Sequence, residues 1–386
     1  MIDEAAGAEP FGAGALLRGR FALPRRRGGP PARAELSASW RFEGGTHMRF
    51  AELAPGDDAP SRPFPRPTPA QDVALFRLEG ATVGRRGAVF LGEDAFLLRT
   101  AARFWPEIAA DPARRRYVLT PHGVAVGPEG ARLIGPPETV ERVETPLFLL
   151  STYAEDAYTH FIIDVLSRLH VWWRMPEPRP RLLVSREVHA RRRAVFEALG
   201  IGPEQLFLKP EAGWIAADAL WASDYPPSAA APVIADFRER LFPDGPPPQT
   251  GERIYLTRHD AFFWDRAVLN ERALIAMLTA RGFRCVNLGD LDFRAQLDRL
   301  AGAGIIAGQF GGALFNLLFG VGGRRVLMLA SENYTRHHLD EADGALGNRV
   351  VRLRCRSFLA RSDPNNSAML VDLDAAAAAL DALEAG

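Results

Sequence analysis

Residues 303–319 read AGIIAGQFGGALFNLLF, which is a short apolar run, a glycine-rich turn and a second apolar run. The first run, residues 304–307, has the length expected of a buried strand. The second run, residues 313–319, is expected to form a helix that begins at the turn. Glycines between them allow a sharp change of backbone direction and a close approach to a ligand. The stretch therefore predicts a strand–turn–helix unit of an α/β fold.

The segments on either side of this unit repeat the alternation of strand and helix. In the C-terminal half we expect strands at 253–257, 283–286, 325–329 and 350–353, helices at 270–280 and 293–301, and a helix at 374–383. In the N-terminal half we expect strands at 73–78, 88–91, 117–119, 147–150, 182–184 and 219–221, with helices at 158–173 and 187–199. Alternation at this spacing in the C-terminal half predicts βαβ units and a parallel sheet.

The length of 386 residues suggests two domains. Residues 1–70, rich in Gly, Ala, Pro and Arg, are expected to form a loosely ordered arm. We place an N-terminal α/β domain with a β-rich lead-in at 71–242 and a C-terminal domain at 250–356, with the proline-rich stretch 243–248 as linker. Residues 357–386 are expected to form a tail that contains a helix.

The composition excludes several classes of protein. Lys+Arg and Asp+Glu each number 47, so the net charge of zero argues against a nucleic-acid binder. The two cysteines, Cys285 and Cys355, do not form a disulfide scaffold or a zinc motif. We expect a cytoplasmic protein, because no signal peptide or transmembrane segment is recognisable; peripheral membrane contact is left open.

The glycine turn is the first candidate binding element, through Gly308, Gly311 and Gly312. A helix that starts at such a turn offers N–H groups and a positive dipole end to a phosphate. The alternative is a tight packing turn, since the spaced glycine fingerprint of dinucleotide-binding proteins is absent.

A second candidate group follows the strand at 253–257. Arg258 is expected at the carboxyl end of that strand, where open α/β sheets bind ligands, and Arg266 follows it. Two arginines near a glycine turn could hold a diphosphate through paired hydrogen bonds. Alternatively, both arginines are surface residues, and Asn270 only caps a helix with Glu271 in its first turn.

A third candidate group lies on the helix predicted at 158–173. The spacing of His160, Asp164 and Arg168 places all three on one helix face. A histidine beside a carboxylate can act as a general base. The alternative is a surface ion pair that contributes little to stability.

Metal binding is not expected. The two Asp-Leu-Asp triplets, 290–292 and 372–374, each precede a predicted helix, where an aspartate is an ordinary N-cap. The pair His337 and His338 has no further ligand at a diagnostic spacing.

Taken together, the motifs from about residue 145 to 355 resemble glycosyltransferase family 61, the family that includes capsular polysaccharide biosynthesis proteins. The resemblance rests on HFIIDVLSRL at 160–169, Thr257-Arg258, RAVLNE at 266–271, Gly282-Phe283 with Gln296, and the turn from Gly308 to Asn316. Two positions depart from the family pattern. Phe310 occupies the position of a histidine, and Met328 that of an acidic residue whose role Glu332 could take.

The resemblance implies a GT-B-like fold, with two Rossmann-like domains facing a cleft. It implies an inverting transfer of a sugar from a nucleotide-sugar donor to a glycan or polysaccharide acceptor, without a metal or other cofactor. His160 or Asp164 would be the base. The donor would be held by residues of the C-terminal domain, namely Arg258, Arg266, Asn270, Glu271, Gly308, Gly311, Gly312 and Asn316.

Two other functions compete with this interpretation. The departures at Phe310 and Met328 favour a non-catalytic nucleotide- or sugar-binding relative in polysaccharide assembly. A nucleotide-dependent oxidoreductase is disfavoured, because the glycine turn lies late in the chain and lacks the usual fingerprint.

Overall fold

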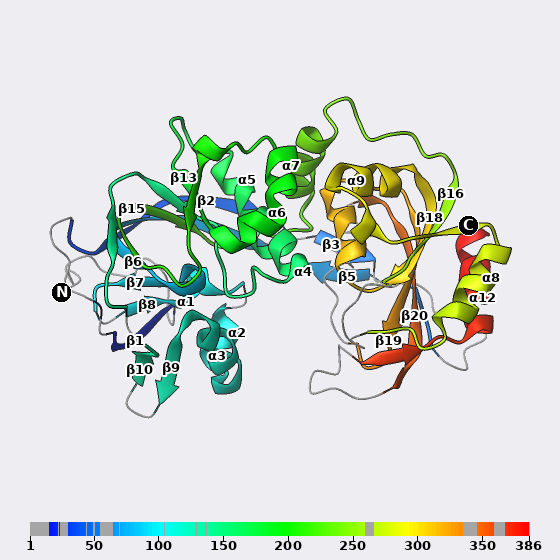
Figure 1. The fold of residues 1–386 in the computed structure, drawn as a ribbon, viewed down its shortest axis with the longest axis horizontal. Coiled ribbons are helices and arrows are strands. Elements are labelled where there is room, and N and C mark those ends of the chain that lie inside the picture. The colour runs from blue at the N-terminus through cyan, green and yellow to red at the C-terminus, as the bar shows by residue number, and fades with distance from the viewer. Residues whose placement is uncertain are drawn as a thin grey trace. The chain divides into compact units, whose positions relative to one another are not determined.

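The computed structural model shows a mixed α/β protein (Figure 1). It describes residues 15–21, 23, 30–43, 45–48, 51–54, 65–68, 70–93, 95–103, 105–127, 130–135, 137–258, 266–334, 346–358 and 367–385. The chain divides into two compact units. Unit 1 comprises Met1–Phe42 and Gln71–Ser228, and unit 2 comprises Glu43–Ala70 and Ala229–Gly386.

Unit 2 is built on a parallel sheet, as the C-terminal alternation predicted. Its strands run in the order β17 (Phe283–Val286), β16 (Glu252–Leu256), β18 (Ala303–Gln309), β19 (Arg325–Ser331) and β20 (Arg349–Phe358). The connecting helices are α8 (Glu271–Ala280), α9 (Phe293–Gly302) and α10 (Gly312–Phe315), which continues as the 3₁₀ turn η7 (Asn316–Phe319). The antiparallel strand β21 (Ala368–Leu370) and the helix α12 (Leu373–Glu384) complete the C-terminal end.

The sheet of unit 2 is covered on both faces, which explains why β18 is buried along its whole length. Figure 1 shows α8 and α12 on one side of the sheet and α9 on the other. The first side forms an apolar core that includes Tyr255, Leu278 and Leu380. On the other side, α7 (Ala231–Leu241) packs the ring of Phe237 on that of Phe319, with 5.6 Å between the ring centroids.

Unit 1 contains a larger mixed sheet. Strands β14 (Leu206–Lys209), β13 (Arg181–Ser185), β12 (Leu147–Leu149) and β15 (Ile215–Ser223) are parallel, and β6 (Gln71–Val83) continues the sheet antiparallel to β15. Beyond β6 lie β7 (Val89–Leu91), β8 (Ala95–Leu97), β1 (Leu16–Arg20), β10 (Gly130–Leu133) and β9 (Val124–Gly127), while β11 (Glu141–Val143) pairs with β15.

The helices of unit 1 include α1 (Leu98–Ala101), α2 (Trp105–Ala110), α3 (Pro112–Leu119) and α6 (Arg186–Ala198), with short 3₁₀ turns at Arg85–Gly87, Thr120–His122 and Pro203–Gln205. The helix predicted at 158–173 is confirmed as one helical segment of mixed type. It runs through α4 (Tyr158–His160), the π-helical turn η3 (Phe161–Val165), the 3₁₀ turn η4 (Leu166–Arg168) and α5 (Leu169–Trp172).

The first 70 residues differ from the expected loosely ordered arm, because several of their segments pair with strands from later in the chain. β2 (Arg33–Phe42) lies antiparallel to β6, and β4 (Ala51–Leu53) lies parallel to β20. A further pair joins β3 (Gly45–Met48) and β5 (Pro65–Thr68). Strand pairing supplies the hydrogen bonds and burial that the composition of this region does not predict. The cluster Arg25-Arg26-Arg27 lies outside the described residues.

The boundary between the units also differs from the predicted linker at 243–248. It falls at 228/229, because α7 belongs to unit 2. The apolar face of α7 packs on η7, and Arg238 donates a 3.2 Å hydrogen bond from Nε to the carbonyl of Gly320. The proline-rich stretch therefore connects two parts of one unit.

One element was assigned to the wrong class. Residues 117–119, predicted as a strand, are the last turn of α3. Asp111 starts this helix, because its carboxylate accepts hydrogen bonds from the N–H groups of Ala113 and Arg114, at 2.9 and 3.2 Å. A run of three apolar residues is too short to distinguish a strand from the end of a helix.

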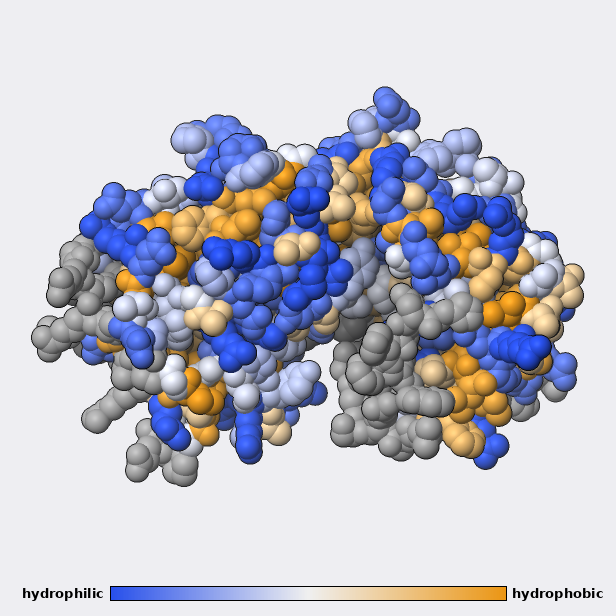
Figure 2. All heavy atoms as spheres, in the orientation of Figure 1, coloured by the Kyte–Doolittle hydropathy of each residue, from blue (hydrophilic) through white to orange (hydrophobic). Residues whose placement is uncertain are grey.

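Hydrophilic and hydrophobic residues alternate in small areas over the face of the molecule that Figure 2 shows. Within the described residues, no helix combines the length and the apolar character needed to span a bilayer.

Candidate functional site

His160 and Asp164 form a hydrogen-bonded pair on the helical segment of unit 1. Nδ1 of His160 lies 2.7 Å from Oδ2 of Asp164, one helical turn further on. The π-helical turn between them is a local irregularity of a kind that is frequent at functional sites. A carboxylate on Nδ1 favours a proton there and leaves Nε2 as the basic nitrogen. The His160 side chain is 25% exposed and that of Asp164 only 4%, so the pair has a solvent side and a buried side.

Arg103 is the second partner of Asp164. Its Nε lies 2.8 Å from Oδ1 of Asp164, and its guanidinium also donates to the carbonyls of Ile163 and Pro226. Burial alone would raise the pKa of Asp164, but the charge of Arg103 together with the hydrogen bond and charge of His160 lowers it to about 2. Asp164 is therefore ionised throughout the physiological pH range and can orient His160.

Arg168 does not join this pair, although its spacing placed it on the same helix face. Its side chain is fully buried, and Nη2 donates to the carbonyl of Thr100 at 2.7 Å. The guanidinium carbon lies 3.9 Å from the centre of the Tyr225 ring, a cation–π contact. Arg168 thus stabilises the interior of unit 1.

In unit 2, Arg258 and Arg266 converge on the glycine turn. A Cβ atom placed on Gly311 would lie 3.5 Å from Nη1 of Arg266 and 3.9 Å from Nη1 of Arg258. Nη1 of Arg266 also donates to the carbonyl of Phe310 at 3.2 Å. Two guanidinium groups and a residue without a side chain therefore meet at the end of β18, which is an arrangement that suits a diphosphate.

The backbone of Arg266 is unusual, since its φ of 61° lies in the left-handed region. A residue other than glycine costs about 1 kcal/mol or more there, and such residues concentrate at functional sites. The helix after the turn is shorter than predicted, because α10 has four residues before it tightens into η7. The two arginines, more than a helix dipole, supply the positive charge at this turn.

Asn270 and Glu271 bond to other residues of unit 2. The amide of Asn270 does not cap α8; instead Nδ2 donates to the carbonyl of Val371 at 2.7 Å, and Oδ1 accepts from its N–H at 3.0 Å. Oε1 of Glu271 accepts from the hydroxyl groups of Tyr255 and Thr257, at 2.8 and 3.0 Å. Glu271 therefore fixes the end of β16, directly before Arg258.

Gly308 and Asn316 have structural partners. A Cβ atom on Gly308 would lie 3.1 Å from Cβ of Leu256, so this glycine permits close packing of β18 on β16. Asn316 is buried, and its Nδ2 donates to Oε1 of Gln296 at 3.1 Å. Gln296 in turn donates to the carbonyl of Leu291 at 3.0 Å, which connects the glycine turn to the start of α9. Gly312 is the first residue of α10.

The residues that depart from the family pattern are part of the packing of unit 2. Phe310 is buried, and its ring centre lies 4.2 Å from that of Tyr334 and 5.5 Å from that of Phe315. Met328 is buried within β19. Oε1 of Glu332 accepts the backbone N–H of Ser357 at 2.9 Å, so this carboxylate already has a structural role.

One aspartate of each Asp-Leu-Asp triplet caps a helix. Asp292 accepts the N–H of Ala295 at 2.8 Å, and Asp372 accepts those of Asp374 and Ala375 at 3.0 Å. The part of the chain that the structure describes contains no group of three or more His, Cys, Asp or Glu residues arranged to hold a metal. His337 and His338 lie outside that part.

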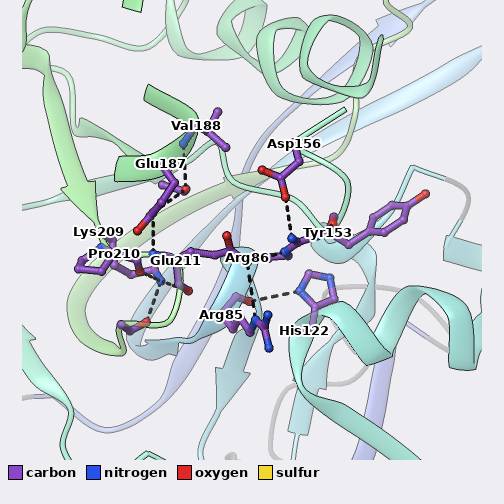
Figure 3. A network of polar contacts seen from close by, with 12 residues as sticks. Arg85, Arg86, His122, Tyr153, Asp156, Glu187, Val188, Lys209, Pro210 and Glu211 are labelled. Atoms are coloured by element: carbon purple, nitrogen blue, oxygen red, sulfur yellow. Dashed lines mark hydrogen bonds and ion pairs between the residues drawn. The ribbon is translucent and has the colours of Figure 1, made fainter. Parts of the chain in front are cut away.

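Sequence reasoning missed Arg103 and a polar network in unit 1 that Figure 3 shows. In this network Arg86 donates to Glu211 at 2.8 Å from Nε, to the carbonyl of Tyr153 at 3.0 Å and to Asp156 at 2.6 Å. Lys209, the only lysine of the chain, is buried and donates to backbone carbonyls of Pro210 and Gly213. These partners come from separate parts of the sequence and share no local motif, so no signal could have identified them.

Residues 158–327 match the model of a family described as glycosyltransferase 61. The matched range begins at the helical segment that carries His160 and Asp164, and it includes Arg258, Arg266 and the glycine turn. No curated protein shows significant similarity to the chain.

Proposed function

We propose that the protein is a glycosyltransferase, because residues 158–327 match the model of the glycosyltransferase 61 family, and that it transfers a sugar from a nucleotide-sugar donor to a glycan or polysaccharide acceptor with inversion at the anomeric carbon. The convergence of Arg258 and Arg266 on Gly311 is the observation that carries this proposal.

His160 is proposed as the base of this reaction. Its Nε2 takes the proton of the acceptor hydroxyl as that oxygen attacks the anomeric carbon, and the bond from this carbon to the diphosphate breaks. Asp164 holds the imidazole through Nδ1 and stabilises the imidazolium that forms, while Arg103 keeps Asp164 ionised. The electrons of the broken bond remain on the diphosphate.

Arg258 and Arg266 are proposed to stabilise the departing diphosphate, together with backbone N–H groups after Gly311. Two guanidinium groups provide positive charge and directional donors at this position. We therefore propose that no metal is required. Sugar transfer is expected to continue unchanged in EDTA, and loss of transfer that Mg²⁺ or Mn²⁺ restores would contradict this part of the proposal.

Binding of the donor can be tested with the intact chain by thermal unfolding in the presence of millimolar UDP, GDP, CMP and UDP-sugars. A ligand that binds only the folded state raises its stability by about 2.7 kcal/mol at 100 times its Kd. At least one of these nucleotides is expected to raise the melting temperature. No stabilisation by any of them would overturn the assignment of the donor site.

The proposed diphosphate clamp, which consists of Arg258 and Arg266, can be tested by Arg258→Ala. Loss of a charged hydrogen-bond donor costs about 1.5–3 kcal/mol, which weakens nucleotide binding roughly 10- to 100-fold. Arg284→Ala is the matched control, because Arg284 is an exposed arginine on the adjacent strand β17 that pairs with Glu252. Equal nucleotide affinities for wild type and Arg258→Ala would remove Arg258 from the clamp.

A non-catalytic binding protein is the second candidate, favoured by the apolar packing of Phe310 and Met328 at positions where the family has polar residues. It predicts that a nucleotide binds at the arginines but that no acceptor in a broad glycan panel receives a sugar.

A further inference from the structure

Aromatic rings form a continuous series that ends at His160. The ring centroid of Tyr153 lies 6.0 Å from that of His160, and the Tyr117 ring lies 6.4 Å from that of Tyr153, nearly perpendicular to it. His122 lies 6.4 Å from Tyr153 on a buried side. The series therefore runs from solvent at Tyr117, through the partly buried Tyr153, to the side chain proposed as the base.

Tyr117 is the most exposed large apolar side chain among the described residues, at 73%. Its neighbours Val118 and Leu119 turn into the core of unit 1, while Tyr117 remains outside at the end of α3. A single exposed tyrosine is common on protein surfaces. Its contact with Tyr153, whose ring in turn contacts the His160 ring, distinguishes this one.

Tyr153 is held in place through its backbone by Arg86. The guanidinium of Arg86 bonds the Tyr153 carbonyl, Asp156 and Glu211 at the same time. Figure 3 shows the Tyr153 ring directed away from this guanidinium. Arg86 has a φ of 50°, a left-handed conformation that costs about 1 kcal/mol or more and persists only when its surroundings enforce it.

Arg191 reinforces the same support, since its guanidinium pairs with the second oxygen of Asp156. The two arginines thus hold the backbone carbonyl of Tyr153 and the carboxylate of Asp156. The Tyr153 side chain is partly buried and packs against the core of unit 1, and a ring held in this way loses little conformational entropy when a ligand stacks on it.

We propose that Tyr117 and Tyr153 form the subsite for the acceptor sugar, in which a pyranose ring stacks its C–H face on one tyrosine ring, lies against the edge of the other and directs a hydroxyl group toward Nε2 of His160. This inference deepens the proposed function and rests on it. The faces of aromatic rings carry partial negative charge and attract the slightly positive C–H groups on the apolar face of a sugar. The hydroxyl groups at the rim of the sugar remain available for the base.

The test uses the intact chain and compares Tyr117→Ala, Tyr153→Ala and Tyr153→Phe. The probes are methyl glycosides and disaccharides of glucose, galactose, mannose, xylose and N-acetylglucosamine, with binding followed by saturation-transfer NMR and transfer followed by release of nucleoside diphosphate. Both alanine variants are expected to raise the acceptor KM at least 10-fold, or to abolish saturation transfer, with donor KM unchanged. Tyr153→Phe is expected to keep wild-type affinity, because stacking requires the ring and not the hydroxyl group.

Leu36→Ala is the control, since Leu36 is 55% exposed on β2 of the same unit and contacts none of these rings in the described structure. Tyr117→Ala keeps the test decisive even if Tyr153→Ala unfolds, because a side chain this exposed contributes little to stability.

The outcomes separate this subsite from the proposed function. Transfer by the wild type with an acceptor KM that neither alanine variant changes would overturn the subsite and leave the function standing. Sugar binding that both variants abolish, without any nucleotide binding or transfer by the wild type, would support the subsite and overturn the function. If the wild type binds no sugar of the panel and transfers to none, the subsite is rejected.

Discussion

A buried carboxylate remains ionised only when nearby groups stabilise its charge, and Asp164 has two such groups. Arg103 bonds one carboxylate oxygen and His160 the other, at 2.8 and 2.7 Å. The motif around His160 and Asp164 was visible in the sequence because the two residues are four apart on one helix. Arg103 lies 61 positions upstream, between α1 and α2, and only the folding of unit 1 brings it to Asp164.

Asp164→Asn tests whether the carboxylate orients the base. The amide carries no negative charge to stabilise an imidazolium, so kcat is expected to fall about 100-fold or more, with donor affinity unchanged. Steady-state kinetics over pH 5–9 measures this. Asp218→Asn is the control, because Asp218 pairs with Arg142 at the surface of the same unit. A kcat of Asp164→Asn equal to that of the control would argue against the base assignment.

Glu155 presents the opposite electrostatic situation. Burial raises its pKa to about 7, although hydrogen bonds from Ser151 and from the N–H of Thr152 oppose this. The folded state therefore binds a proton more tightly than the unfolded state. The stability that this proton provides is present below pH 4 and is lost as the pH rises from about 4 to 7.

Glu155→Gln is consequently expected to stabilise the protein at pH 8, where the wild type must keep a buried charge. The gain is on the order of 3 kcal/mol, from the pKa difference, and it should fall markedly by pH 5. Denaturant unfolding at both pH values measures it. A variant that changes the free energy of unfolding equally at pH 5 and pH 8 would show that Glu155 is not protonated as described.

At the scale of elements, sequence patterns identified most strands and helices but not those that depend on distant partners. The parallel strands of unit 2 were predicted from short apolar runs, and the helix at the C-terminus from its alanine-rich sequence. Residues 33–42 gave no such signal, since their alternation becomes meaningful only beside β6. Residues 117–119 were misassigned because the N-cap at Asp111 was overlooked.

The cap of α12 provides a prediction at this scale. Asp372 accepts two N–H groups at the start of the helix, so Asp372→Ala is expected to cost about 1 kcal/mol of stability. Asp381→Ala is the control on the same helix, because its ion pair with Arg281 is exposed and contributes little. Urea unfolding of both variants compares them, and equal losses would contradict the capping role.

At the scale of the whole molecule, each unit has a core of its own, although the chain passes between the units at 42/43, 70/71 and 228/229. The units are therefore expected to unfold in separate transitions. Tryptophan fluorescence should follow mainly unit 1, whose residue ranges hold six of the seven tryptophans, Trp40, Trp105, Trp172, Trp173, Trp214 and Trp221.

A bound nucleotide should consequently raise the midpoint temperature of one unfolding transition and leave that of the other unchanged. Because the proposed clamp lies in unit 2, UDP or the nucleotide that binds should shift the calorimetric transition of unit 2 by several degrees and leave the midpoint of tryptophan fluorescence almost unchanged. Calorimetry and fluorescence on one sample measure this. A nucleotide shift seen mainly in the fluorescence transition would place its site in unit 1.

The sequence by itself determined the class of the C-terminal fold, a resemblance to one family over residues 158–327 and the motif residues, because these depend on local periodicity, on glycines at a turn and on fixed spacing along a helix. Tertiary structure alone decided which side chains meet. In the folded protein Arg103 contacts Asp164, and Arg168 lies in the core of unit 1. Arg258 and Arg266 lie next to Gly311. Tertiary structure also joined residues of the first 53 positions to strands far along the chain. Contacts between residues distant in sequence depend on packing and burial in three dimensions, and no local pattern encodes them.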